Sequence, residues 1–140
     1  MDDTDRRLIA LLRENARLPV ATLARLLKVS RGTVQNRIDR LTADGAISGF
    51  TVRVKPDAEP PRVRAITMVA VDGEHAAVVL KSLRGIPEIQ ALHTTNGRWD
   101  IVAELSVDSL EAFDQALQRI RLIKKISNSE TCLLLSTHKI

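Results

Sequence analysis

Residues 30 to 40 contain a set of side chains that can bind DNA. The amides of Gln35 and Asn36 can each pair with an adenine edge in bidentate fashion, and arginine can pair with guanine or with phosphate. At about 100° per residue, these polar groups fall on one arc of a helix that begins with the small residues Gly32 and Thr33. We therefore predict a helix that enters the major groove of double-stranded DNA with its N-terminal end first. The candidate DNA-binding residues are Ser30, Arg31, Gly32, Thr33, Gln35, Asn36, Arg37 and Arg40.

These residues are expected to differ in role. Gln35 and Asn36 point at bases, Arg40 contacts phosphate, and Arg37, on the flank of the arc, contacts phosphate or anchors the helix. The alternative is an ordinary solvated helix surface. The charge distribution favours DNA, because residues 1 to 56 contain 11 Lys and Arg against 6 Asp and Glu, whereas residues 57 to 140 contain 10 against 11. Clustered cations attract a polyanion and release its condensed counterions.

Three helices are expected to position this surface. The first begins at a Thr4 cap and ends near Asn15. The second follows Pro19, which is accepted in the first turn of a helix. Residues 28 to 30 form a turn, and Ser30 caps the third helix, which stops at Gly45. The apolar stripes that pack these helices together are Leu8, Leu11 and Leu12, then Val20, Leu23, Ala24 and Leu27, then Val34, Ile38 and Leu41.

The pattern changes after this helical segment. Residues 47 to 54 alternate apolar and polar side chains, which predicts an extended wing or exit strand. Residues 55 to 61 contain the only proline-rich stretch, which favours a stiff extended connection. We therefore expect a winged helix-turn-helix domain in residues 1–55, a linker in residues 56–61 and a second domain in residues 62–140.

The second domain is expected to alternate strands and helices. Strands are predicted at residues 64–71, 89–95, 101–107 and 126–137, and helices at residues 74–83 and after a cap at Asp108 or Ser109. The order βαββαβ predicts a ferredoxin-like α+β unit, in which an antiparallel sheet carries both helices on one face. An apolar sheet face left in water invites association, so we expect a homodimer.

Motifs in both domains carry a family resemblance. They are Asp2-x-x-Asp5-x-x-Leu8-Ile9-x-x-Leu12, Leu23-Ala24-x-x-Leu27, Ser30-x-x-x-Val34-x-x-Arg37-Ile38-x-x-Leu41, Gly45-x-Ile47-x-Gly49-Phe50 and, in the second domain, Gly97-x-x-Asp100. With them, essentially the whole chain resembles the Lrp/AsnC family of feast/famine transcriptional regulators. The resemblance implies a DNA-binding N-terminal domain and a C-terminal domain of the RAM type that mediates assembly and senses a small effector, commonly an amino acid.

The resemblance also marks one departure. Lys28 stands where the turn of the family usually has glycine. If the backbone there is left-handed, a residue with a Cβ costs about 1 to 2 kcal/mol.

An effector site at a subunit interface, beside the Gly-x-x-Asp turn, is a further implication of the resemblance. In this chain Asp100 can hold an ammonium group, Arg98 can meet a carboxylate, Thr95 can form hydrogen bonds and Trp99 supplies an apolar wall. The alternative is a structural turn in which Asp100 accepts backbone amides. The candidate effector-binding residues are His93, Thr95, Asn96, Gly97, Arg98, Trp99, Asp100, Ser129 and Thr131.

The expected partners follow from these domains. A two-fold symmetric dimer presents two recognition helices to a roughly palindromic operator, and the family resemblance implies further assembly into tetramers or octamers. The acidic N-terminus is unlike a signal peptide, and the single cysteine excludes an internal disulfide. No apolar run approaches the ~20 residues of a membrane span. We therefore expect a bacterial or archaeal protein of the cytoplasm, associated with the nucleoid, with no membrane partner.

Enzymatic functions find little support in the sequence. His75, His93, His138 and Cys132 show no metal-ligand spacing, and no Walker loop or GxSxG motif occurs. We expect a non-enzyme without a metal or cofactor. The enzyme alternative is siroheme decarboxylase, whose subunits resemble this chain in their two-domain architecture. His93, expected at the edge of a pocket, keeps this alternative open. A winged helix that binds protein is a third possibility, and three aromatic residues are too few for stacking on single-stranded nucleic acid.

Overall fold

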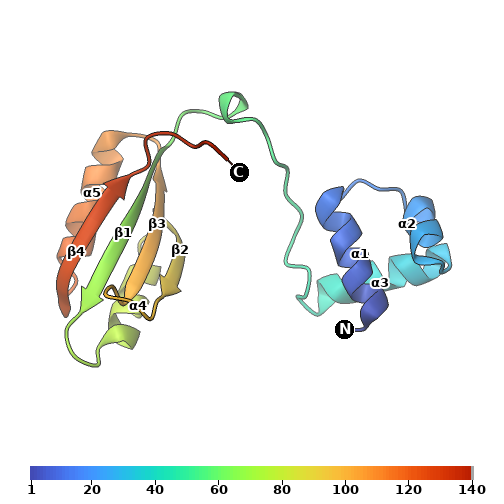
Figure 1. The fold of residues 1–140 in the computed structure, drawn as a ribbon, viewed down its shortest axis with the longest axis horizontal. Coiled ribbons are helices and arrows are strands. Elements are labelled where there is room, and N and C mark those ends of the chain that lie inside the picture. Colours follow the sequence, from blue (N-terminus) through green and yellow to red (C-terminus); the bar gives the residue numbers. More distant parts are fainter. Residues whose placement is uncertain (140) are drawn as a thin grey trace. The chain divides into compact units, whose positions relative to one another are not determined.

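The computed structural model describes residues 1 to 139, which form two compact units. The first unit extends from Met1 to Arg53 and contains three helices, and the second begins at Val54 and contains a sheet with two helices (Figure 1). Each unit has its own apolar core. Residue 140, the last of the predicted second domain, lies outside the described residues. Within residues 1 to 139, no helix is long and apolar enough to cross a membrane.

The first unit is built from α1 (Asp3–Glu14), α2 (Val20–Leu27) and α3 (Arg31–Ala43). Their apolar stripes meet in one core, as the sequence predicts, and Ile38 lies half-buried beside it. The buried members of this core are Leu8, Leu12, Leu23, Ala24, Leu27, Val34 and Leu41. Because the apolar face of α3 is used for this packing, its polar face is left at the surface.

The start of α1 differs from the prediction. Asp2, not Thr4, caps the helix: its Oδ1 accepts the amide of Asp5 at 2.8 Å, and Asp5 Oδ2 accepts the amide of Asp2 at 3.0 Å. Aspartate caps a helix at least as well as threonine, and this reciprocal capping box satisfies two amides that the helix itself leaves without partners. Thr4 therefore lies inside the first turn.

The turn between α2 and α3 has the left-handed backbone that usually selects glycine. Lys28 adopts a φ of 57°. The amide of Lys28 donates to Arg25 O at 3.3 Å, and the amide of Val29 donates to Ala24 O at 3.0 Å, so carbonyls at the end of α2 have partners. The turn thus keeps the geometry of a helix-turn-helix with a lysine at the strained position.

The strand predicted over residues 47 to 54 is not formed. The amide of Ile47 donates to Leu41 O at 2.9 Å, and residues 48 to 55 belong to no helix or strand. Phe50 and Val52 are 58 % and 80 % exposed. A strand needs a second strand for its backbone hydrogen bonds, and the three helices offer none. The apolar and polar residues alternate as in a strand, but no second strand is there to pair with them. This segment therefore does not form a β-strand wing.

The second unit has the predicted order βαββαβ and follows a short 3-10 helix, η1 (Pro56–Ala58). Its strands are β1 (Val63–Val71), β2 (Ile89–Thr94), β3 (Ile101–Val107) and β4 (Ile126–Leu133), and its helices are α4 (Ala76–Arg84) and α5 (Leu110–Arg121). The antiparallel sheet has the order β2-β3-β1-β4. β4 ends at Leu133, which pairs with Ala65 of β1, and so stops before the predicted Thr137.

The two faces of the sheet differ in burial. One face packs against α4 and α5 through Ala65 and Val69 of β1 and the alternate residues of β3 (Figure 1). Alternation along the strands places a second apolar set on the other face, where it stays half-buried. The members of this outer face are Ile66, Met68, Ala70, Ala91 and Val102. Neither helix of the unit covers it.

Candidate DNA-recognition and effector sites

The polar face of α3 begins at a well-formed cap. Ser30 Oγ accepts the amide of Thr33 at 3.1 Å, and the hydroxyls of Ser30 and Thr33 lie 2.8 Å apart. The capped end leaves Arg31 and Gly32 exposed at the tip of the helix. The leading end of α3 is therefore both fixed by its cap and small enough to approach a DNA groove.

The central side chains of this face are exposed. Gln35 and Asn36 reach solvent, and Gln35 Nε2 donates to Asp39 Oδ1 at 2.8 Å, one helical turn later. Because an ionised carboxylate only accepts, the amide nitrogen of Gln35 must face Asp39 and its carbonyl oxygen must face away. Asp39 thus orients one of the two amides predicted to contact bases.

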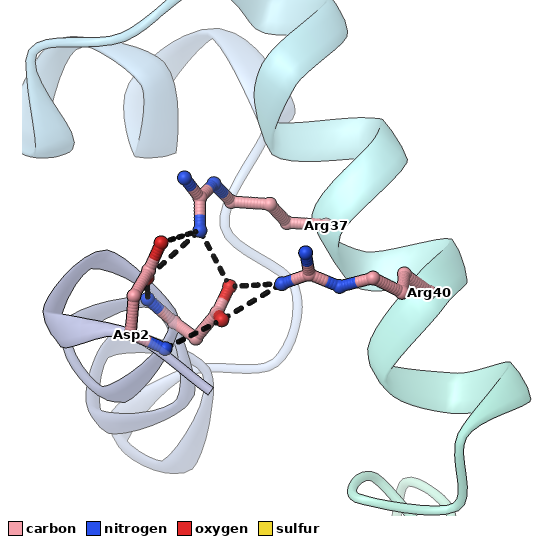
Figure 2. A network of polar contacts seen from close by, with 4 residues as sticks. Asp2, Arg37 and Arg40 are labelled. Carbon is pink, nitrogen blue, oxygen red and sulfur yellow. Dashed lines mark hydrogen bonds and ion pairs between the residues drawn. The ribbon is translucent and has the colours of Figure 1, made fainter.

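Arg37 and Arg40 both contact carboxylates at the start of α1. The contact of Arg37 is one of the two roles predicted for it, whereas the contact of Arg40 was not predicted. Arg37 Nη1 donates to Asp2 Oδ1 and Oδ2 at 2.8 and 2.7 Å and to Asp5 Oδ1 at 2.8 Å (Figure 2). Arg40 Nη2 donates to Asp5 Oδ1 and Oδ2 at 2.9 and 2.7 Å. Of the two roles considered for Arg37, the structure shows the anchoring contact. Arg40, predicted to contact phosphate, also holds α1, because the start of α1 places the carboxylate of Asp5 beside it.

Electrostatics in this cluster favour the charged forms. The capping hydrogen bond from the amide of Asp2, followed by the side-chain hydrogen bond from Arg37, lowers the pKa of Asp5 to about 2. The side-chain hydrogen bond from Arg37 likewise lowers the pKa of Asp2, and the same contacts with Asp2 and Asp5 raise the pKa of Arg37. The four residues therefore form a charged network that joins α1 to α3.

Asp2 and Asp5 were missed as functional candidates by the sequence analysis, although their spacing belongs to the family motif. Two acidic residues three apart before an apolar run are typical of a capping box, and that signal identifies the helix start. Their contact with Arg37 and Arg40 depends on how α1 crosses α3, which local spacing does not encode.

The turn that joins β2 to β3 is held by hydrogen bonds to β1 and by bonds within the turn. Asp100 Oδ2 accepts the amide of Val71 at 2.7 Å, and the amide of Asp100 donates to Val69 O at 2.8 Å. The Thr95 hydroxyl donates to Trp99 O and accepts the amide of Gly97 at 3.2 Å. These contacts match the structural alternative for Asp100, which nevertheless remains exposed to solvent.

The predicted effector residues are only partly brought together. Thr95 to Asp100 share this turn, with exposed Asn96 near its tip and Arg98 Cζ 5.4 Å from the centroid of the Trp99 ring. His93 lies on the outer face of the sheet, with its Nε2 3.4 Å from Glu104 Oε2. Ser129 and Thr131 point to the opposite face, because they pair with buried Val69 and Thr67.

A cavity of about 290 Å³ adjoins those two hydroxyls. Its lining combines apolar side chains with the two hydroxyls and Arg121. The hydroxyls of Thr131 and Thr67 lie 2.9 Å apart at its edge. The residues that line it are Phe113, Leu117, Ile120, Arg121, Ser129, Thr131 and Leu133. Ser129 and Thr131 therefore belong to a hollow between α5 and β4 rather than to the turn itself.

Within the part of the chain that the structure describes, no three His, Cys, Asp or Glu side chains come together as a metal site. His93 lies exposed on the sheet, and Cys132 is exposed on the edge strand β4.

Comparison with known proteins decides the family. A family model described as an AsnC-type helix-turn-helix domain matches residues 1–42, and one described as the Lrp/AsnC ligand binding domain matches residues 64–140. The chain belongs to the Lrp/AsnC family. It is therefore a transcriptional regulator with a helix-turn-helix DNA-binding domain and a ligand-binding domain.

Individual relatives of this Lrp/AsnC regulator cover nearly its whole length. It is 26 % identical over 139 residues to the HTH-type transcriptional regulator FL11 of Pyrococcus furiosus, which covers 99 % of this chain and 92 % of that protein. It is 31 % identical over 137 residues to the HTH-type transcriptional regulator Rv2324 of Mycobacterium tuberculosis, with 97 % and 93 % covered. The solved structure of E. coli AsnC matches with a TM-score of 0.82 at 25 % identity, covering 100 % and 95 %. These relatives are named as regulators, so the siroheme decarboxylase alternative is not supported.

Proposed function

We propose that this Lrp/AsnC regulator reads double-stranded operator DNA with the exposed face of α3. Gln35 and Asn36 contact base edges, and the residues from Ser30 to Thr33 lead the helix into the major groove. One observation carries the proposal: Val34 and Leu41 are buried in the helical core, while Gln35, Asn36 and Arg40 between them remain exposed. Arg40, with a side chain 52 % exposed, contacts phosphate in addition to Asp5.

Selection of bound genomic fragments, followed by footprinting, tests this proposal and defines an operator. Gln35→Ala and Asn36→Ala are expected to change the preference at one base pair by about 1 to 3 kcal/mol, because each removes one base contact. Affinity for random DNA should change little, since phosphate contacts supply most of it. Equal losses on operator and random DNA would contradict the division of roles.

A homodimer is the proposed unit of DNA binding. The apolar outer face of the sheet, centred on Met68, is half-buried in one chain and is suited to packing against its counterpart in a second copy. Two recognition helices related by a two-fold axis require a roughly palindromic operator, and further assembly gives tetramers or octamers. Light scattering after gel filtration tests the dimer, and a monomer at micromolar concentration would contradict it.

The proposed effector is a small molecule with an ammonium and a carboxylate group, such as an amino acid, bound where the β2–β3 turn meets a neighbouring subunit. Asp100 and Arg98 supply opposite charges there, and Trp99 supplies an apolar surface. Binding shifts the assembly only by its differential affinity for two arrangements. Calorimetry against the standard amino acids tests this. Arg98→Ala should abolish the heat of binding and leave the melting temperature nearly unchanged, because no hydrogen bond of Arg98 to residues 1 to 139 holds the turn.

The remaining elements of the proposal concern catalysis and location. The protein carries out no catalysis and acts on chromosomal DNA in the cytoplasm, at the nucleoid. Support comes from the regulator names of the relatives and from the polar face that α3 retains. A Soret band that persists after the protein is mixed with siroheme and desalted would contradict the absence of an enzymatic role.

A further inference from the structure

Two acidic residues outside the proposed DNA-binding set, Asp2 and Asp5, hold two arginines of α3, Arg37 and Arg40. We propose that Asp5, together with Asp2, positions Arg37 and Arg40 for operator binding, so that each guanidinium presents one fixed terminal nitrogen to the DNA backbone (Figure 2). The inference rests on the proposed function. It assigns a role in DNA recognition to carboxylates that do not themselves touch DNA.

The first step is the geometry of the two guanidinium groups. Arg37 uses only Nη1 to contact the carboxylates, and Arg40 uses only Nη2. Figure 2 shows the other terminal nitrogen of each group pointing away from the carboxylates. A guanidinium is a rigid planar fork with five N–H donors, so one side can hold a carboxylate while the other contacts a phosphate.

The second step is the rigidity of the carboxylate that holds them. The side chain of Asp5 is 1 % exposed, and it accepts the amide of Asp2 as well as both arginines. Its position is therefore set by the capping box of α1. Arg37 is held so closely that its side chain is only 22 % exposed. An arginine that is already ordered loses less rotamer entropy when it binds phosphate than a mobile one.

The third step separates positioning from charge. Removing an acidic group beside DNA strengthens binding to every sequence, because phosphates are repelled less. Removing a positioning group weakens binding to the operator, where phosphate contacts fix the register of α3. It changes the affinity for random DNA less, because mobile arginines can still contact phosphates there. The ratio of operator affinity to random-DNA affinity therefore reports positioning, and charge alone does not change it.

The experiment compares Asp5→Asn with Asp3→Asn in the full chain, on a selected operator fragment and a random duplex of equal length. Asp3 is the matched control, because it lies in the same helical turn, is exposed and makes no side-chain hydrogen bond or ion pair among residues 1 to 139. Asp3→Asn should strengthen both affinities equally. Asp5→Asn should lower the operator-to-random ratio by about tenfold, with the helix content by circular dichroism unchanged.

Asp2→Ser is a second variant that avoids loss of folding. Serine keeps the helix cap but removes the carboxylate that holds Arg37, and Asp2 is 55 % exposed. The ratio should fall by a few-fold, because Arg37 keeps its contact with Asp5. If Asp5→Asn is unfolded, this variant decides the question alone.

The outcomes are distinct. A ratio within about twofold of wild type in a folded Asp5→Asn protein, or in Asp2→Ser when the former is unfolded, overturns the inference. So does an equal fall in the Asp3→Asn control. Wild-type protein that selects no operator overturns instead the proposed function on which the inference rests.

Discussion

Arg40 donates its Nη2 to both carboxylate oxygens of Asp5, a residue 35 positions earlier in the chain, at 2.9 and 2.7 Å. Arg37 meets the same carboxylate at 2.8 Å. The recognition helix is therefore joined to the start of the first helix by a charged contact in addition to the apolar core. A charged contact of this kind depends on pH, and an apolar core does not.

Acid should destabilise the helical unit through Asp5. The pKa of this carboxyl is lowered from 3.8 to about 2 by the amide of Asp2 and by Arg37. Because the folded pKa lies below the unfolded one, the stabilisation is complete well above 3.8 and is lost as the pH falls through about 2. The wild-type melting temperature, followed by circular dichroism, should fall more steeply over this range than that of Asp5→Asn. Parallel curves would contradict the prediction.

The cap of α3 should contribute measurably to stability. Ser30→Ala removes the oxygen that accepts the amide of Thr33 and should lower the free energy of unfolding by about 1 kcal/mol in urea titrations. Ser48→Ala is the control, because Ser48 is exposed and makes no side-chain hydrogen bond in the described part of the chain. A comparable loss in both variants would mean that the cap is not the cause.

Relief of the strained turn should stabilise the protein. Lys28→Gly is expected to raise the free energy of unfolding by about 1 kcal/mol, because glycine adopts the observed φ of 57° without a Cβ clash. Lys28→Ala removes the same charge but keeps the Cβ, so it should give no such gain. Equal effects of the two substitutions in denaturant titrations would assign the change to charge.

The outer face of the sheet should control assembly. Met68→Glu places a charge at the centre of this apolar face and should convert the proposed dimer to a monomer at micromolar concentration in light scattering. Gln115→Glu adds the same charge at an exposed position of α5 and should leave the mass unchanged. A dimer that survives Met68→Glu would place the interface elsewhere.

Local patterns predicted much of the fold. Ser30 and Gly45 define the ends of α3 because a cap and a left-handed stop act on neighbouring residues, and β3 runs from Ile101 to Val107 as its alternation predicts. The failures are of two kinds. Thr4 was predicted as the cap of the first helix, whereas Asp2 caps it, and the alternating segment after Ile47 lacks the partner strand that a strand requires.

The candidate sites were predictable to a different degree. The exposed amides of Gln35 and Asn36 follow from helical periodicity alone. The contact between Asp5 and Arg40 does not, because it depends on the crossing of two helices. The separation of His93 from Ser129 likewise depends on strand register, which decides the face of the sheet that each side chain occupies.

The stacking of Arg98 over Trp99 has a practical consequence. The chain contains a single tryptophan and no tyrosine, and that indole lies in the β2–β3 turn, while the helical unit contains neither. Its emission therefore reports only on the ligand-binding domain. Any ligand that displaces the guanidinium from the ring should change the wavelength or intensity of the tryptophan fluorescence. DNA bound to α3 alone should leave the fluorescence unaltered. The protein therefore contains an intrinsic fluorescent probe that separates ligand binding from DNA binding.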